Sequence, residues 1–331
     1  MSASPARLAI SATAHNRPDR LRKLLASVAA AEGAEVWPMY LSIEPTPQTE
    51  EVLAVVAAFA GRLHIRTRVN AARKGVRHNP YDTVQWVLEQ GHDTVLLLED
   101  DLVIDRQALR LAQLLDAGPL HEAGVLCANL LMTTCMSESI HVAERPQFDL
   151  LADIVLRTRF FSSYGLLFSR RQWQQHFMPN WFNDTPPMEN WQGRQASGWD
   201  VAMNRVLLTD PQLCVLQSLV PRVTHDGAGG THVGEAFQAL SFDHVQVDVA
   251  PELPLTALRV LDPVADLQQL PTAAARMYVN LCRHLWTLQE STLVFKHHLP
   301  ELGAARAHWF RLGSWEYTLH RKRLSKTGPR T

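Results

Sequence analysis

Short apolar runs alternate with amphipathic stretches along the first hundred residues. The apolar runs predict strands over residues 7–15, 35–44, 63–69 and 94–101. Between them, apolar side chains recur at helical spacing and predict helices from Pro18, over 49–61 and over 80–91, with Asn16 as the cap of the first. Strands that alternate with helices in this way indicate an α/β fold, in which a mostly parallel sheet is flanked by helices.

The second half of the chain is less regular. Residues 124–131 predict a further strand, 159–169 an edge strand or a loop, and 197–208 a helix. From about Leu253 the apolar pattern becomes helical and rich in Trp, as in 277–292 and 305–317. These segments predict a helical C-terminal extension.

Composition and charge exclude several classes of protein. The net charge is −1 and the pI is near 7.0, so no overall field recruits nucleic acid or an anionic membrane. The basic cluster His320–Arg330 is interpreted first as a solvated tail, and it leaves nucleic acid as a less favoured partner that is not excluded. The four cysteines have neither CxxC nor zinc-site spacing, which favours a reducing compartment. The N-terminal pattern lacks a cationic segment followed by a long apolar one, and the longest apolar run, from Val52, is too short to span a membrane. We therefore expect a soluble, cytoplasmic protein.

Three consecutive acids stand at the end of the most apolar predicted strand. Glu99, Asp100 and Asp101 follow Val95–Leu98 directly. Two unit charges ~5 Å apart repel by roughly 3 kcal/mol at an effective dielectric of ~20, so something must offset the repulsion among the acids. Water offsets it if the acids diverge in an exposed turn, and Mg²⁺ or Mn²⁺ offsets it if they form a metal site. Because ligands bind at the carboxyl ends of strands in such sheets, the position favours a site.

The order of these motifs resembles that of glycosyltransferases with the GT-A fold. The closest likeness is to the inverting N-acetylglucosaminyltransferases related to the enzyme that begins hybrid N-glycan branching. The resemblance is carried by Asn-Arg-Pro after the first strand, by the βαβ half, by the apolar strand into Glu-Asp-Asp and by a downstream Trp-Asp segment, and it covers roughly residues 7–245. It implies a transferase domain over 1–250, with a nucleotide-binding half (1–105) and an acceptor half (106–250), and leaves 251–331 as a separate helical region.

Several residues correspond to functional positions of that family. The last acid of the triplet binds Mn²⁺ there, a position that is Asp101 here. The resemblance implies that Arg17 and His78 contact the nucleotide, although His78 can equally be an ordinary loop histidine. It also implies that Glu44, a Glu where the family commonly has Asp, meets the uracil or ribose.

Other residues are candidates by their chemistry. Glu99 and Asp100 complete the donor site beside Asp101. His225 follows a predicted strand and can bind the metal or the diphosphate, because imidazole is a common ligand. The glycine-rich segment 226–235, which contains His232, predicts a lid over that site. Asp105 is expected to cap the next helix rather than to bind metal.

The catalytic base is expected at Asp200. The family's Trp-Asp-Asp-Trp aligns with Gly-Trp-Asp-Val here, which retains one acid and lacks the second Trp. Asp184 and Glu189 in the preceding loop therefore remain rival bases. Three tryptophans of this region either stack on acceptor sugars or pack in the core: Trp181, Trp191 and Trp199.

These residues together predict a metal-dependent inverting glycosyltransferase. Mn²⁺ or Mg²⁺ stabilises the diphosphate leaving group, and a base accepts the proton of the attacking hydroxyl. The predicted reaction moves a sugar, by resemblance GlcNAc, from a UDP-sugar to a glycan or another hydroxyl acceptor. Two alternatives stay open: a catalytically inactive carbohydrate- or nucleotide-binding module with the same fold, and a metal-dependent nucleotidyltransferase. The latter usually has a glycine-rich phosphate loop with a Lys, and the segment after the first strand has no glycine.

Overall fold

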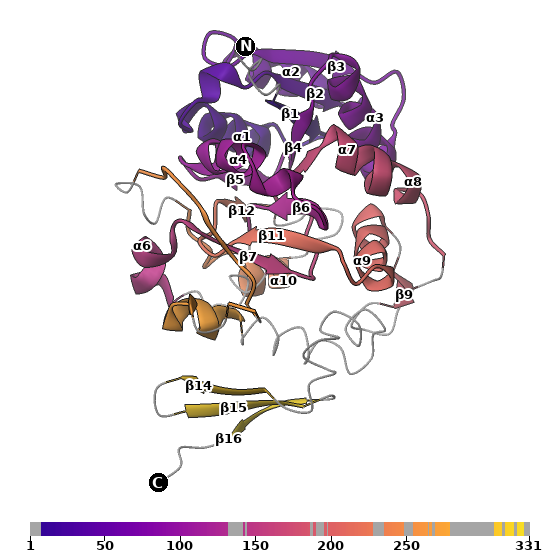
Figure 1. Cartoon of the computed structure of the whole chain (residues 1–331). Helices are drawn as coiled ribbons and strands as arrows, with labels where there is room; N and C mark the ends of the chain where they lie inside the picture. Colours follow the sequence, from indigo (N-terminus) through magenta and orange to yellow (C-terminus); the bar gives the residue numbers. More distant parts are fainter. Residues whose placement is uncertain are drawn as a thin grey trace, which may run out of the picture.

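The computed structural model describes residues 8–131, 142, 144–185, 188–189, 195–196, 198–227, 235–247, 254–263, 265–266 and 269–278, and three strands between 308 and 327. Its centre is a nine-stranded sheet with the strand order β13-β7-β11-β6-β8-β4-β1-β2-β3 (Figure 1). In chain order these strands are β1 (Leu8–Ala14), β2 (Met39–Ile43), β3 (Ile65–Val69), β4 (Thr94–Glu99), β6 (Val125–Asn129), β7 (Ile154–Thr158), β8 (Leu166–Ser169), β11 (Cys214–Ser218) and β13 (Arg259–Leu261).

Helices connect the strands of this sheet. They are α1 (Pro18–Ala30), α2 (Thr49–Ala57), α3 (Gly75–Glu89), α4 (Ala108–Asp116), α6 (Phe148–Leu151), α7 (Arg170–Gln172), α8 (Met178–Asn180), α9 (Trp199–Thr209) and α10 (Glu235–Ser241). A π-helical turn, Trp173–Phe177, joins α7 to α8. Short strands form two small pairs, β5 (Leu102–Ile104) with β12 (Val223–His225) and β9 (Met188–Glu189) with β10 (Gln195–Ala196).

The large sheet is mixed but mostly parallel. Its parallel pairs are β1 with β2, β1 with β4, β2 with β3, β6 with β11 and β7 with β13. β8 runs antiparallel to both β4 and β6, so those two strands point the same way. The carboxyl ends of β1, β2, β4, β6 and β11 consequently share one edge of the sheet, where α/β proteins bind ligands. The predicted α/β architecture is confirmed.

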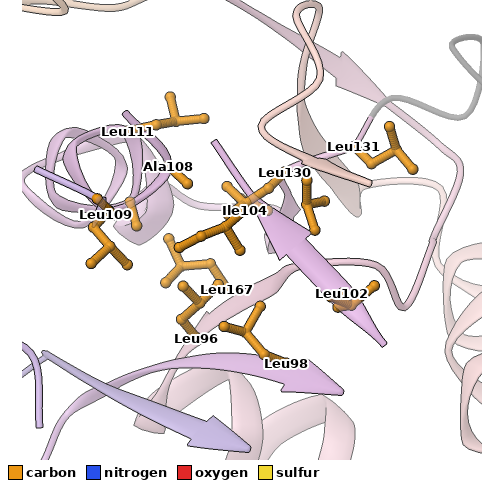
Figure 2. Packing of buried hydrophobic residues seen from close by; sticks show 14 of the residues in the cluster. Leu96, Leu98, Leu102, Ile104, Ala108, Leu109, Leu111, Leu130, Leu131 and Leu167 are labelled. Carbon is orange, nitrogen blue, oxygen red and sulfur yellow. The ribbon is translucent and has the colours of Figure 1, made fainter. Parts of the chain in front are cut away.

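Both faces of the sheet are covered, which explains the continuous apolar run of β4. Leu96 and Leu98 belong to the cluster that packs on α1, α2 and α4, and Figure 2 shows them beneath β5 and α4. Val95 and Leu97 point the other way, into the cluster formed with α3 and α9. A central strand covered on both sides needs apolar residues at every position. The run therefore ends where β4 leaves the core, at Glu99.

Three sequence-based predictions about these elements need correction. The segment 159–169 was expected to be an edge strand or a loop, but β8 lies inside the sheet between β4 and β6, because Leu166, Leu167 and Phe168 are fully buried. α3 begins at Gly75, five residues before the predicted start at Pro80, so Pro80 lies inside the helix and His78 is helical. The C-terminal segment 305–317 was expected to be helical, and its described residues instead form strands.

Those strands are β14 (His308–Leu312) and β15 (Trp315–His320), which pair antiparallel, with β16 (Arg323–Thr327) beside β15. Their apolar residues include the aromatic side chains that strands favour, and the antiparallel pairing overrides the weak helical spacing. Residues 272–278 are helical, as expected, whereas most of 277–292 lies outside the described residues. β13 belongs to the main sheet beside β7, so residues beyond 250 complete that sheet. In the described part of the chain, no helix is long and apolar enough to cross a membrane.

A fully buried arginine fixes β12 to the start of α4. Arg222 donates from Nη1 to Asp105 Oδ1 at 3.1 Å and to Gln107 Oε1 at 3.0 Å, and from Nη2 to the carbonyl of Ala152 at 3.0 Å. Asp105 was expected to cap α4, but the helix begins later, at Ala108, and the carboxylate accepts from the Gln107 N–H at 2.7 Å instead. Asp105 is thus a structural acid.

Arg222→Met is expected to lower the free energy of unfolding by about 3–5 kcal/mol, because it leaves the Asp105 carboxylate buried without its cation. Urea unfolding measures the change. Asp105→Asn in the same chain should recover part of the loss. The control is Arg259→Met, which breaks the half-exposed pair with Asp153 and should cost less than about 1 kcal/mol. Equal effects of the two arginine substitutions would contradict the assigned role of Arg222.

Candidate functional site

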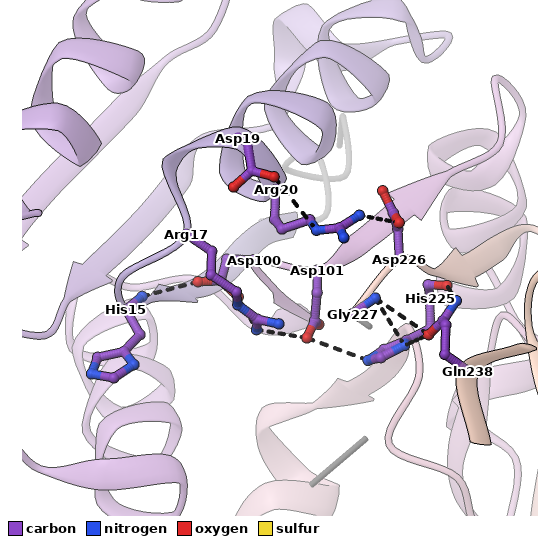
Figure 3. Close-up of polar contacts among 10 residues, drawn as sticks. All are labelled: His15, Arg17, Asp19, Arg20, Asp100, Asp101, His225, Asp226, Gly227 and Gln238. Atoms are coloured by element: carbon purple, nitrogen blue, oxygen red, sulfur yellow. Dashed lines mark hydrogen bonds and ion pairs between the residues drawn. The ribbon is translucent and has the colours of Figure 1, made fainter. Parts of the chain in front are cut away.

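The acids Asp100 and Asp101 lie at the carboxyl end of β4, where two other segments converge on them (Figure 3). The turn between β1 and α1 brings Arg17. β12 brings His225, because its pairing with β5 sets His225 opposite Leu102, the residue after Asp101. The N–H of Asp226 donates to the Asp101 carbonyl at 2.6 Å and holds the two segments together.

Arg17 binds both buried acids of the triplet. Its Nη2 donates to Asp100 Oδ1 at 2.9 Å and to Asp101 Oδ2 at 2.7 Å, while the His15 N–H donates to Asp100 Oδ2 at 2.9 Å. Arg17 is also the N-cap residue of α1, and no side chain caps that helix, so the predicted cap role of Asn16 is wrong. The β1–α1 turn is arranged around the acids rather than around the helix end.

His225 faces Asp101 from the other side. Its Nε2 lies 3.3 Å from Asp101 Oδ2, and both side chains are buried. Burial alone would lower the pKa of His225, but the hydrogen bond and the charge of Asp101 raise it above its ordinary value. Burial likewise opposes the charge on Asp101, yet His225 and Arg17 hold the pKa of that carboxyl below its ordinary value. The two cations therefore keep Asp101 ionised.

The other two acids differ from Asp101. Burial raises the pKa of Asp100 to about 6, against the opposing charge of Arg17. The Glu99 side chain is accessible to solvent although many protein atoms surround it. This enclosure and the charges of Asp101 and Asp100 raise the pKa of Glu99 to about 8. The triplet thus contains one firmly ionised carboxylate, Asp101, flanked by two that accept protons more readily.

Two buried polar atoms at this site lack a hydrogen-bond partner: Asp101 Oδ1 and Arg17 Nη1. A buried polar atom without a partner in the protein is open to a bound ion, anion or water. An unpaired carboxylate oxygen fits a cation, and an unpaired guanidinium N–H fits an anion such as phosphate. Asp101 Oδ1 is an acceptor and Arg17 Nη1 is a donor, and their two side chains are hydrogen-bonded to each other.

The donors fit a small divalent ion in part. Among the described residues, no group of three or more His, Cys, Asp or Glu side chains is arranged to hold a metal. Asp101 and His225 supply two donors. Asp101 Oδ2 lies 3.3 Å from His225 Nε2, close to the about 3 Å that separates neighbouring ligands of an octahedral ion with bonds of about 2.1 Å, and the unpartnered Oδ1 is the other oxygen of the same carboxylate. Mg²⁺ and Mn²⁺ complete their coordination with water and phosphate, so two protein ligands suffice.

Asp200 and Tyr164 both lie near Glu99. Asp200 lies exposed in the first turn of α9, and its charge contributes to the raised pKa values of both Glu99 and Tyr164. The Tyr164 ring packs edge-on against His225, with ring centroids 5.5 Å apart. Tyr164 was not a sequence candidate. Gln238, which binds His225, carried no sequence signal either.

Glu44 and His78 make other contacts. The Glu44 carboxylate accepts hydrogen bonds from the N–H groups of Lys74 (2.9 Å) and Gly75 (2.7 Å) and so stabilises the start of α3. This capping explains why α3 begins before Pro80. The charge of Glu44 also reaches His15 at the end of β1. His78 is exposed and packs against Phe182, with ring centroids 4.7 Å apart. Nucleotide contacts of either residue remain predictions.

The acceptor-side candidates are partly accounted for by packing. Trp181 and Trp199 stack on each other at 4.4 Å with nearly parallel rings, and both are buried, so neither presents a face to a sugar. Asp184 is paired with Arg77 through two hydrogen bonds of 2.8 and 3.0 Å. Trp191, His232 and most of the predicted lid lie outside the described residues, as does the side chain of Glu189.

Comparison with known proteins gives only distant likeness. No protein-family model and no curated protein matches the sequence. Among solved structures, S. aureus TarS (residues 1–349) has a TM-score of 0.41 at 11% identity over 65% of this chain, and its complex with UDP-GlcNAc has 0.42 at 14% over 70%. The mannosyltransferase PcManGT from Pyrobaculum calidifontis, in complex with GDP-Man and Mn²⁺, has 0.43 at 12% over 65%.

This chain spans 61% of the length of both TarS structures and 57% of PcManGT. With TM-scores and identities this low, the likeness carries no conclusion about function. The fold rests on the strand order and pairing described above.

Gly227 leaves no room for a side chain next to the Asp101–His225 contact. A Cβ at this position would collide with His225 Cε1, and would lie 2.5 Å from His225 Nε2 and 2.7 Å from Asp101 Oδ2. Gly227→Ala should therefore displace His225 and lower the free energy of unfolding by about 1–3 kcal/mol. Gly61→Ala is the matched control, because its Cβ would meet no atom within 4 Å, and it should be neutral or slightly stabilising. Chemical unfolding of both variants, without added ligand, checks the prediction. A neutral Gly227→Ala would contradict this packing.

Proposed function

We propose that this protein is a metal-dependent glycosyltransferase of the GT-A type that uses a nucleoside diphosphate sugar as donor. The observation that carries the proposal is the pair of buried, unpartnered atoms, Asp101 Oδ1 and Arg17 Nη1, at the carboxyl end of a central parallel strand. A divalent cation with a diphosphate satisfies both atoms at once, since it brings a ligand-seeking metal and anionic oxygens together.

Asp101 and His225 are the residues that would hold Mn²⁺ or Mg²⁺. When bound, the ion offsets the charge that develops on the departing diphosphate. Arg17 binds the same diphosphate through Nη1, while its Nη2 keeps Asp100 and Asp101 in place. Glu99 and Asp100 line the donor site beside the ion.

Asp200 is the proposed base. It is exposed, stands on the first turn of α9, and lies near enough to Glu99 for their charges to interact. From there its carboxylate accepts the proton of an acceptor hydroxyl as the oxygen attacks the anomeric carbon from the side opposite the diphosphate. One such displacement inverts the configuration at that carbon. Asp184 is the weaker candidate, because Arg77 already neutralises it.

The finer assignment concerns the donor. By its resemblance to the N-acetylglucosaminyltransferases, the transferred sugar is GlcNAc and the nucleotide is UDP, with Glu44 and His78 on the nucleoside side. The capping of α3 by Glu44 supports a role in shaping that end of the site, since the start of α3 and the end of β1 meet there. The acceptor is a hydroxyl compound, such as a glycan.

Asp101→Asn should remove Mn²⁺-dependent binding of UDP, because the amide is a poor ligand and loses the charge that attracts the ion. A ligand at 100 times its Kd stabilises the native state by about 2.7 kcal/mol, so thermal unfolding with UDP, with and without Mn²⁺, measures the loss. Asp153→Asn is the control, an aspartate in an exposed pair far along the chain. If Asp101→Asn keeps the full Mn²⁺-dependent shift, the metal assignment is wrong.

Asp200→Asn should keep donor affinity and lower turnover by roughly 10²–10⁴-fold, the usual contribution of a general base. Stability should barely change, since Asn is also tolerated at the exposed start of a helix. Asp184→Asn is measured in parallel. A normal rate for Asp200→Asn together with a slow Asp184→Asn would move the base to Asp184. Donor binding with no transfer by the wild type to any hydroxyl acceptor would favour an inactive binding module.

A further inference from the structure

The imidazole of His225 is held from behind by a buried glutamine of α10. His225 Nδ1 lies 2.8 Å from Gln238 Oε1, and both side chains are almost fully buried. Nδ1 is the nitrogen that faces away from Asp101, whereas Nε2 faces it. The hydrogen bond on Nδ1 therefore decides which of the two nitrogens carries the proton when the ring is neutral.

The orientation of the Gln238 amide is fixed by its own partners. Its Nε2 donates to the His225 carbonyl at 2.8 Å and to Asp243 Oδ1 at 3.0 Å. Both partners can only accept, so the NH₂ group must point toward them and Oε1 must point toward the ring. An oxygen that faces Nδ1 at 2.8 Å requires a hydrogen on that nitrogen.

One contact competes with this assignment. The Gly227 N–H lies 3.2 Å from His225 Nδ1 and 3.4 Å from Gln238 Oε1. If it donated to Nδ1, that nitrogen and Gln238 Oε1 would face each other as two lone pairs at 2.8 Å, which is strongly unfavourable. The Gly227 N–H therefore pairs with Gln238 Oε1, and Nδ1 keeps its proton.

When the ring is neutral, the opposite nitrogen, Nε2, therefore has its lone pair toward Asp101, whereas in the protonated ring Nε2–H faces Asp101 Oδ2. The 3.3 Å separation of Nε2 and Asp101 Oδ2 is longer than the about 2.7–2.9 Å of a charge-assisted hydrogen bond. It suits two ligands of one ion better. We propose that Gln238 is a positioning residue that fixes the Nδ1–H form of His225 and so presents Nε2 to a divalent cation shared with Asp101. The cation is the one in the proposed function, on which this part of the inference rests.

The tautomer can be measured without metal or activity. Nitrogen-15 NMR of the metal-free protein, at a pH where the ring is neutral, should show His225 protonated on Nδ1. In Gln238→Met the acceptor is lost, and the ring should shift toward the Nε2–H form, which can donate to Asp101. Mn²⁺ affinity in the presence of UDP, measured by calorimetry, should fall by about 10–100-fold, the usual effect of losing such an outer partner.

Two further variants separate positioning from packing. Gln172→Met removes another buried glutamine that donates to two backbone carbonyls, those of Leu120 and Val125, away from the site. It should cost stability and leave both the tautomer and Mn²⁺ affinity unchanged. Gln238→Glu keeps an oxygen toward Nδ1 and should retain the Nδ1–H form, and it serves if the Met variant does not fold.

Each outcome decides a different point. A wild-type ring protonated on Nε2, or a tautomer that does not respond to loss of the Gln238 amide, would overturn the inference. If the tautomer behaves as expected but the wild type binds no Mn²⁺ with UDP, the proposed function fails while the positioning of His225 by Gln238 stands.

Discussion

The site at the end of β4 is organised around the charge of Asp101, which with burial raises the pKa of its neighbours Glu99 and Asp100 through charge repulsion. Two carboxylate charges ~5 Å apart cost roughly 3 kcal/mol at an effective dielectric of ~20, a large fraction of a stability of ~5–15 kcal/mol. Arg17 and His225 offset this repulsion, and they reach Asp101 from opposite sides. Each of the two residues constrains the chain next to it. Arg17 is the N-cap residue of α1, which has no side-chain cap, and His225 leaves no room for a side chain at position 227.

The sheet topology is what makes that convergence possible. The antiparallel β8 between β4 and β6 keeps the parallel strands of both halves pointing to one edge. β5 and β12 then form a separate pair at that edge, so that a histidine far along the chain lies beside Asp101. Buried Arg222 anchors the approach to β12 through Asp105. Arg222 and Asp105 thus help to position His225 beside Asp101, although neither is a candidate for binding a ligand.

The amino-acid pattern predicted the alternating first half well, because β1, β2 and β4 are short apolar runs separated by amphipathic segments. It placed Asp101, Arg17 and His225 among the candidates, and the structure brings these three side chains together, while their functional roles stay predictions. It could not identify Gln238, because a glutamine in an amphipathic helix is ordinary and its meaning comes from a contact across thirteen residues. It misassigned 305–317, where helical spacing and β-favouring aromatic residues compete and pairing decides. It left both sugar stacking and core packing open for Trp181 and Trp199, because their stacking on each other depends on tertiary contacts.

On the proposed function, charge balance couples the metal to the donor. A divalent cation alone would add two positive charges next to Arg17, and a diphosphate alone would add two negative charges next to Asp100 and Asp101. Either change is costly in a buried site, where like charges are poorly screened. Together the two additions cancel, and each satisfies one of the orphaned atoms, Asp101 Oδ1 and Arg17 Nη1. The same arrangement that keeps the acids compatible with folding therefore favours the metal and the diphosphate as a pair over either one by itself.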